Sequence, residues 1–170
     1  MEENEQIRVS NSGLIILWPF FTAFFERAGY VQEAAFISAS HQNRALYALQ
    51  YLGYNAIDFP EYELPLNKML VGMPVEQTVD PIEALTTEEM ELSKGLLEGG
   101  LIQNWPKVQN SSPEAIQETF IHREGILKLS SDHLELRVER RGVDILMDTI
   151  PWELSLINLP WMEKPLHIVW

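Results

Sequence analysis

Cysteine is absent from the 170 residues of this chain, and basic residues are few. Without cysteine the chain forms no disulfide, no thiolate metal site and no cysteine nucleophile. Lysine and arginine number 12 against 25 aspartates and glutamates, which gives a formal net charge of −13. Contacts to phosphates need clustered cations, and the two small basic clusters, Arg140-Arg141 and Arg137 with Lys128, lie among acids. The charge balance therefore argues against a nucleic-acid partner.

Long apolar runs are also lacking. The longest covers residues 14–25 and has about twelve mainly apolar residues, against the roughly twenty that a membrane-spanning helix needs. It contains Pro19, and the residues before it include Glu2, Glu3 and Glu5, whereas a signal peptide begins with basic residues. We therefore expect a soluble helix in this run, with no export signal and no membrane insertion.

The remaining composition is that of an ordinary globular protein. Apolar residues make up 46% of the chain and charged residues 22%, and the length fits one domain. We expect residues 1–9 to be a polar lead-in and residues 10–170 to form a single globular domain. Within it, we expect a helical part over residues 10–125 and a β-rich part over residues 126–170.

Helical spacing of apolar residues and helix-boundary residues predict the helical part. The first helix should run from about residue 13 to Gly29, and Pro19 should bend or break it. Thr86 and Glu89 have the spacing of a capping box, which predicts the start of a later helix. This helix should cover residues 86–103. The other expected helices cover residues 34–52, 66–71 and 113–123.

After Gly125 the apolar period changes from about 3.6 to 2, which predicts a β-hairpin over residues 126–139 with one solvated face. Residues 143–149 fit either a helix or a strand, and we favour one or two helical turns. Residues 154–159 and 166–169 are typical of short strands. The predicted fold class is α+β, with N-terminal helices followed by a small antiparallel β-sheet at the C-terminus.

No residue pattern indicates a catalytic centre, a cofactor site or a metal site. The histidines show no His-x-x-x-His spacing, and the serines form no Gly-x-Ser-x-Gly turn. The Gly99-Gly100 pair lacks the lysine of a phosphate-binding loop. We therefore expect no catalytic residues, no metal, no cofactor and no enzyme activity.

Aromatic residues supply the candidate partner-binding positions. The run over residues 14–25 is apolar on nearly every face, and a core of this size covers only part of such a helix. Tryptophan is typical both of cores and of binding hot spots, so each of the five tryptophans is either a core residue or an interface residue. We expect Trp152 to lie in the core. The candidate partner-binding residues are Trp18, Phe20, Phe21, Phe24, Trp161 and Trp170.

A series of short motifs runs in order along most of the chain. The opening motifs are SGLIILWPF at residues 12–20 and LNKMLVGMP at 66–74. The middle motifs are NWP at 104–106, NSS at 110–112 and TFIHREG at 119–125. The closing motifs are LRVER at 136–140, DIL at 144–146, IPW at 150–152 and LPWM at 159–162. Together they resemble the tape measure protein family of contractile injection systems, the phage-tail-like particles of bacteria.

The resemblance covers residues 10–170, and the order of the motifs is more specific than any single one. The chain departs from the family pattern at Glu153 and Asn158, where glycine and lysine are usual. It departs again at residues 10–12, which read Ser-Asn-Ser in place of His-Asn-Ala. A rod of about 30 helical residues spans only about 45 Å, too short to measure a tail. The chain therefore resembles the globular conserved region of the family without its ruler.

This resemblance implies a non-catalytic structural or assembly protein of a phage-tail-like particle. Its implied partners are tube, baseplate or spike proteins, and a homo-oligomer is compatible with it because spikes are commonly threefold and tubes sixfold. Its implied location is the cytoplasm during assembly and then the injection particle. The alternative is a small acidic adaptor or chaperone-like protein that binds another assembly component.

Overall fold

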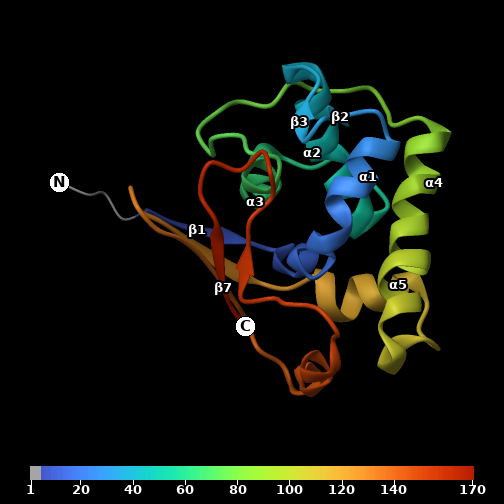
Figure 1. Ribbon diagram of the computed structural model, residues 1–170. Coiled ribbons are helices and arrows are strands. Elements are labelled where there is room, and N and C mark those ends of the chain that lie inside the picture. The colour runs from blue at the N-terminus through green and yellow to red at the C-terminus, as the bar shows by residue number, and fades with distance from the viewer. Residues whose placement is uncertain (1–4) are drawn as a thin grey trace.

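Five strands form a sheet along one side of the protein in the computed structural model, which describes residues 5–170 (Figure 1). In spatial order the strands are β1 (Glu5–Val9), β4 (Gly125–Leu129), β5 (Leu134–Val138), β7 (Leu166–Val169) and β6 (Leu156–Ile157). Strands β5 and β7 are parallel, and the other neighbours are antiparallel. The α+β class predicted from the sequence is confirmed.

The predicted position and type of the sheet are wrong in two respects. Strand β1 lies in the segment expected to be a polar lead-in, so the sheet is not confined to the C-terminal residues. The sheet is also mixed, because β7 pairs in parallel with β5. Both errors concern long-range pairing: β1 has only Ile7 and Val9 as alternating apolar residues, too few to indicate which strand lies beside it.

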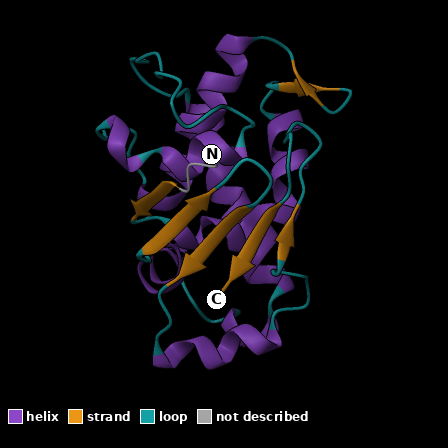
Figure 2. Cartoon of the chain, turned by 90° about the vertical axis from the view of Figure 1, so that its left-hand side faces the viewer, coloured by secondary structure: helices purple, strands orange, loops and turns teal. Residues whose placement is uncertain are grey.

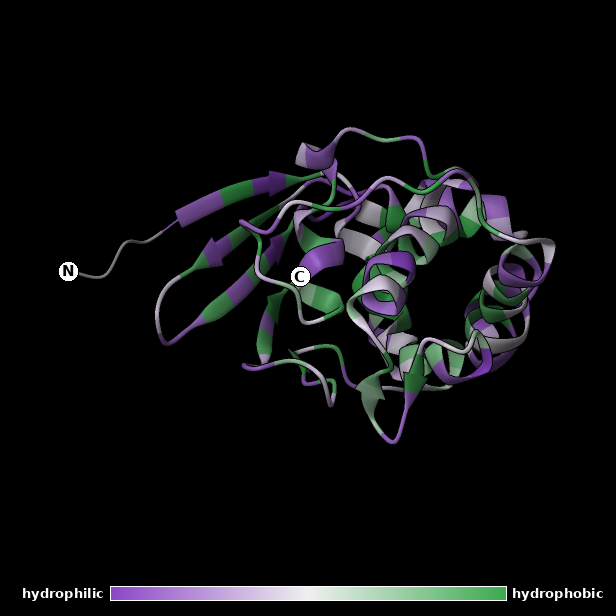
Figure 3. Cartoon of the chain, turned by 90° about the horizontal axis from the view of Figure 1, so that it is seen from above, coloured by the Kyte–Doolittle hydropathy of each residue, from purple (hydrophilic) through white to green (hydrophobic). Residues whose placement is uncertain are grey.

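The register of the strands separates a buried face from an open one. Ile7, Leu127 and Leu136 lie opposite one another in a row that faces the helices, and Leu127 and Leu136 are fully buried. The alternate row, with Arg8 and Arg137, faces away. Figure 2 shows the sheet from its open side with the helices behind it, and Figure 3 shows polar and apolar residues alternating along the strands.

The central helix lies against the buried face. It begins as the 3-10 helix η1 (Ser12–Phe20), which contains Pro19, and continues as α1 (Phe21–Arg27), so the helix type changes between Phe20 and Phe21. Residues 14–17 of η1 are fully buried. A helix that is apolar all round is stable here because the sheet covers one side and other helices cover the rest.

Several of the remaining helices pack against this central one. Thr86 and Glu89 form the predicted capping box at the start of α4, with bonds of 3.1 and 2.8 Å. Ser112 caps α5 through the Ala115 amide. In chain order the helices are α2 (Ala39–Tyr54), η2 (Glu61–Glu63), α3 (Pro65–Leu70), α4 (Thr87–Gly95), the π-helical η3 (Leu96–Ile102), η4 (Pro106–Val108), α5 (Pro113–Ile116), the π-helical η5 (Gln117–Ile121) and η6 (Gly142–Thr149).

A two-stranded hairpin replaces the beginning of the helix expected over residues 34–52. Strands β2 (Val31–Gln32) and β3 (Ala35–Phe36) are joined by Glu33 and Ala34, which both have positive φ angles, 52° and 64°. Glycine or asparagine is the usual signal for such a turn, and this turn has neither. Helix α2 therefore begins at Ala39, after the cap residue Ser38.

Candidate partner-binding groove

An open groove of about 530 Å³ lies between α1 and the helical rod formed by α4 and η3. Figure 1 shows α1 beside α4. The walls of the groove come from segments far apart in the sequence, and most of its lining side chains are apolar or small. The lining residues are Phe20, Ala23, Phe24, Arg27, Glu88, Glu91, Leu92, Gly95, Leu96, Gly99, Gly100 and Asn104. The groove therefore has the size and character of a binding site for an apolar side chain or helix face of another protein.

Aromatic rings form the wall that comes from η1 and α1. Phe20 is half-buried and packs edge to face against Trp152, with ring centroids 5.2 Å apart and planes at 86°. Phe24, one turn further along, is 4% exposed. This wall is rigid, because Phe20 is held by a ring whose own indole N–H donates to the Ile16 carbonyl at 2.8 Å.

Glycine backbone forms much of the opposite wall. Gly95 and Gly99 are four residues apart and so lie on one face of the rod. A Cβ atom added at Gly95 would meet nothing within 4 Å, and one at Gly99 would meet only the Gln103 side-chain oxygen, at 3.9 Å. The backbone of the rod is therefore open to close approach by a partner.

The rod widens to π-helical geometry at the glycines. The Asn104 side-chain amide donates to the Gly100 carbonyl at 2.6 Å and to the Gly99 carbonyl at 3.3 Å. Such π segments occur frequently at functional sites. The rim of the groove is charged, with Glu88 and Glu91 on α4 and Arg27 on α1.

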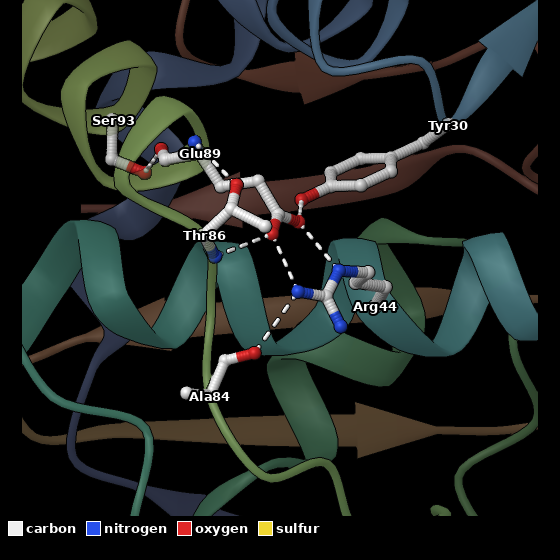
Figure 4. Close-up of polar contacts among 6 residues, drawn as sticks. All are labelled: Tyr30, Arg44, Ala84, Thr86, Glu89 and Ser93. Carbon is white, nitrogen blue, oxygen red and sulfur yellow. Dashed lines mark hydrogen bonds and ion pairs between the residues drawn. The ribbon is translucent and has the colours of Figure 1, made fainter.

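A buried polar network fixes the position of this rod (Figure 4). The Glu89 carboxylate accepts two bonds from the Arg44 guanidinium, at 2.7 and 2.5 Å, and one from the Tyr30 hydroxyl. It also accepts the Thr86 amide at 2.8 Å, while Arg44 donates to the Ala84 carbonyl at 3.0 Å. The first turn of α4 is thereby tied to α2 and to the segment after α1.

The same network sets the protonation of its members. Burial alone would raise the pKa of Glu89, but the bonds from Arg44, the Thr86 amide and Tyr30 outweigh it and hold the pKa at about 2. Burial and the neighbouring Glu89 carboxylate raise the pKa of the Tyr30 hydroxyl well above its usual range. Glu89 is therefore ionised and Tyr30 neutral over the whole physiological pH range.

This pKa predicts a stability loss in acid. Because the pKa of Glu89 is about 2 in the folded chain and 4.5 ordinarily, its contribution is complete above about pH 4.5 and is lost as the pH falls toward 2. The Glu89→Gln variant should be less stable at pH 7 by about 1–3 kcal/mol, and its melting temperature should fall less than that of the wild type between pH 4.5 and 2. Thermal melts across this range measure both. The exposed Glu91→Gln is the control; identical curves for Glu89→Gln and the wild type would contradict the assignment.

The groove contains two of the six residues predicted to bind partners, Phe20 and Phe24. Phe21 is instead fully buried and stacks on Phe25, with ring centroids 6.0 Å apart. Trp18 is partly buried and donates its indole N–H to the Glu153 carbonyl at 2.7 Å. The sequence analysis named Phe20 and Phe24 of the aromatic wall as candidates but did not name the glycines of the opposite wall.

The two remaining candidates, Trp161 and Trp170, lie away from the groove and are each held by the fold. Trp161 donates to the Leu70 carbonyl at 2.7 Å and packs on Phe25 and Phe36, with ring centroids 5.4 and 5.1 Å away. Trp170 donates to the Asp144 carboxylate at 2.7 Å. Their binding role stays a prediction, and the structure gives each of them intramolecular contacts as well.

Within residues 5–170, no group of three or more His, Asp or Glu side chains is arranged to hold a metal ion. None of the helices in the same range is long and apolar enough to cross a membrane. The groove has an aromatic wall, a glycine wall and a charged rim, which suits contact with another protein.

The structure is thus an α+β domain with an open, largely apolar groove on its surface. A family model described as contractile injection system tape measure protein matches residues 1–170, the whole chain. The chain belongs to the contractile injection system tape measure protein family. No curated protein and no solved structure matches it. Membership implies a structural component that contacts other components of an injection particle.

Proposed function

We propose that this domain is a non-catalytic assembly module that docks on a tube, baseplate or spike protein through the groove between α1 and the α4–η3 rod. Assembly takes place in the cytoplasm, and the domain then stays within the particle. The observation that carries the proposal is the groove itself, an open space of about 530 Å³ between a rigid aromatic wall and exposed helix backbone.

The occupant that suits these walls is an apolar helix or loop of the partner. Backbone exposed at Gly95 and Gly99 allows a partner to approach more closely than any side-chain-bearing wall would. Phe20, which is partly exposed in the groove, supplies aromatic contact area of the kind that dominates binding energy in protein interfaces. Arg27 on one rim and Glu88 on the other suit partner charges of both signs.

The test fills the groove without removing any contact of the fold. Gly95 has helical angles, φ −61° and ψ −32°, and open space around its Cβ position, so Gly95→Leu should keep or raise the melting temperature. The leucine side chain should occupy the groove and weaken capture of the particle component roughly tenfold or more, about 1.4 kcal/mol. The measurement is the affinity of the purified chain for the tube, baseplate and spike proteins of its own system.

Gly142→Leu is the matched control, because Gly142 also has nothing within 4 Å of its Cβ position and lies on η6, outside the groove. It should bind like the wild type. Unchanged binding by Gly95→Leu would overturn the groove as the docking site. Capture of an assembly factor that is missing from the finished particle would favour the adaptor or chaperone-like alternative.

A further inference from the structure

Both walls of the groove are faces of helices. On η1 and α1 the lining residues have the i, i+3, i+4, i+7 spacing of one helical face and are Phe20, Ala23, Phe24 and Arg27. On the rod they fall into two adjacent rows at intervals of four residues, Glu91-Gly95-Gly99 and Glu88-Leu92-Leu96-Gly100-Asn104. The groove therefore follows two helices, as the space for a third helix does.

One of the two rows on the rod lacks a ridge of side chains. Side chains at intervals of four normally form a ridge on a helix, and the ridges of one helix pack into the grooves of another. In the row Glu91-Gly95-Gly99 only Glu91 has a side chain, and the nearest neighbour of a Cβ atom at either glycine would be 3.9 Å away. The row is thus a channel that fits the ridge of a partner helix, whereas the side chains of a strand alternate with a period of two.

The groove has an apolar end and a charged end. At the apolar end, the ring of Phe20 lies 3.5 Å from the Cβ position of Gly100. From there the two walls run in opposite directions, since Tyr30, just after α1, bonds to Glu89 in the first turn of α4. Arg27, the last residue of α1, therefore lies at the same end of the groove as the start of α4.

Negative charge predominates at the charged end. Glu88 and Glu91 stand on the α4 wall, and Arg27 is the single cation among the lining residues. All three are exposed, and in the part of the chain that the structure describes, residues 5–170, none of them belongs to an ion pair. The whole chain also carries a net charge of −13. Cations of a partner are therefore attracted to the α4 wall, and anions are repelled from it.

We propose that the groove receives an amphipathic helix of a partner protein, with an apolar ridge in the Gly95-Gly99 channel and lysine or arginine against Glu88 and Glu91. This inference rests on the proposed function, because it names the chemistry of the segment that docks there. The shorter wall, residues 20–27, extends about 10 Å, so about two turns of the partner helix contact both walls.

Charge reversal on the α4 wall tests the cations of the partner. Glu88→Lys with Glu91→Lys should weaken binding of the tube, baseplate or spike protein roughly tenfold at low salt, and less at high salt, where exposed charges are screened. Glu139→Lys with Glu163→Lys, at exposed positions outside the groove, changes the net charge equally and is the control. Melting temperatures verify folding, and the corresponding glutamine pair at 88 and 91 serves if the lysine pair melts early.

The absence of cysteine allows a separate test of the helix. Gly95→Cys and Gly99→Cys, each carrying a short photoactivatable cross-linker, lie roughly 6 Å apart along the rod. Helices rise about 1.5 Å per residue and strands about 3.3 Å, so the partner residues labelled from the two positions should be about four apart in a helix and about two apart in a strand. Labelling at strand spacing, or of an acidic segment, would overturn the proposal.

This inference and the groove itself fail in different ways. Unchanged binding by Gly95→Leu would overturn the groove as the docking site, and the partner helix with it. If Gly95→Leu binds weakly while the Glu88→Lys, Glu91→Lys pair binds as tightly as its control at low salt, the groove remains the docking site and only the cationic helix is refuted.

Discussion

Replacing Arg123 with methionine is expected to destabilise the fold by about 3–5 kcal/mol, because it leaves the Asp144 carboxylate buried without its cation. Both side chains are almost fully buried, at 0% and 1% exposure. The guanidinium donates to the two carboxylate oxygens at 2.7 and 2.5 Å. Burial alone would raise the pKa of Asp144, but bonds from Arg123, the Arg141 amide and Trp170 hold it at about 2. Asp144 is therefore charged in the folded protein at neutral pH.

Chemical denaturation at pH 7 measures the loss. The double variant Arg123→Met with Asp144→Leu should recover part of it, since the cost of the single change comes from a charge left alone. Arg137→Met is the control, because Arg137 is half exposed and its contact with Glu135 is 3.7 Å long; its cost should stay below about 1 kcal/mol. An Arg123→Met protein as stable as this control would refute the role of the pair.

Ending the chain after residue 150 is expected to abolish cooperative unfolding. The removed segment contains β6 and β7, and β7 lies between β5 and β6 rather than at an edge. It also contains Leu166, which is fully buried, and Trp152, whose indole N–H is bonded to the central helix. Without these residues the sheet is reduced to β1, β4 and β5, and apolar surface that β6 and β7 covered is exposed to water.

Thermal melts of the shortened chain measure this effect, and a sharp transition in residues 1–150 would show that the C-terminal strands are dispensable. Two point variants on β7 separate packing from truncation. Leu166→Ala, on the buried face, should cost about 2–5 kcal/mol. Val169→Ala, on the open face at 39% exposure, should cost well under 1 kcal/mol.

Local signals in the sequence located most helices and the hairpin. Thr86 with Glu89, and Ser112 with Pro113, mark helix starts that depend only on neighbouring residues, so they could be recognised without the fold. The alternation over residues 126–139 likewise specifies β4, β5 and their shared buried face. Strand β1 and the parallel β5–β7 pair could not be found in this way, since their partners are distant in the sequence.

The candidate site was predictable only on its aromatic side. Phe20 and Phe24 stood out because aromatic residues are costly to expose. Gly95 and Gly99 gave no such signal, since a glycine becomes part of a groove only when packing leaves its backbone open. For Trp161 and Trp170, the neighbouring residues in the sequence favoured a binding surface. In the structure their indole N–H groups donate to acceptors in distant segments of the same chain.

The pairing of Val9 with Gly125 also affects how fast the protein reaches its native state. Helices such as α2 form from neighbouring residues, whereas the β1–β4 ladder requires two distant parts of the chain to meet. Loop closure of this length costs entropy before any ladder bond compensates for it, and folding rates fall as contacts become less local. The helical layer should therefore assemble first and the sheet last, so the slowest step of folding is completion of the β1–β4 ladder.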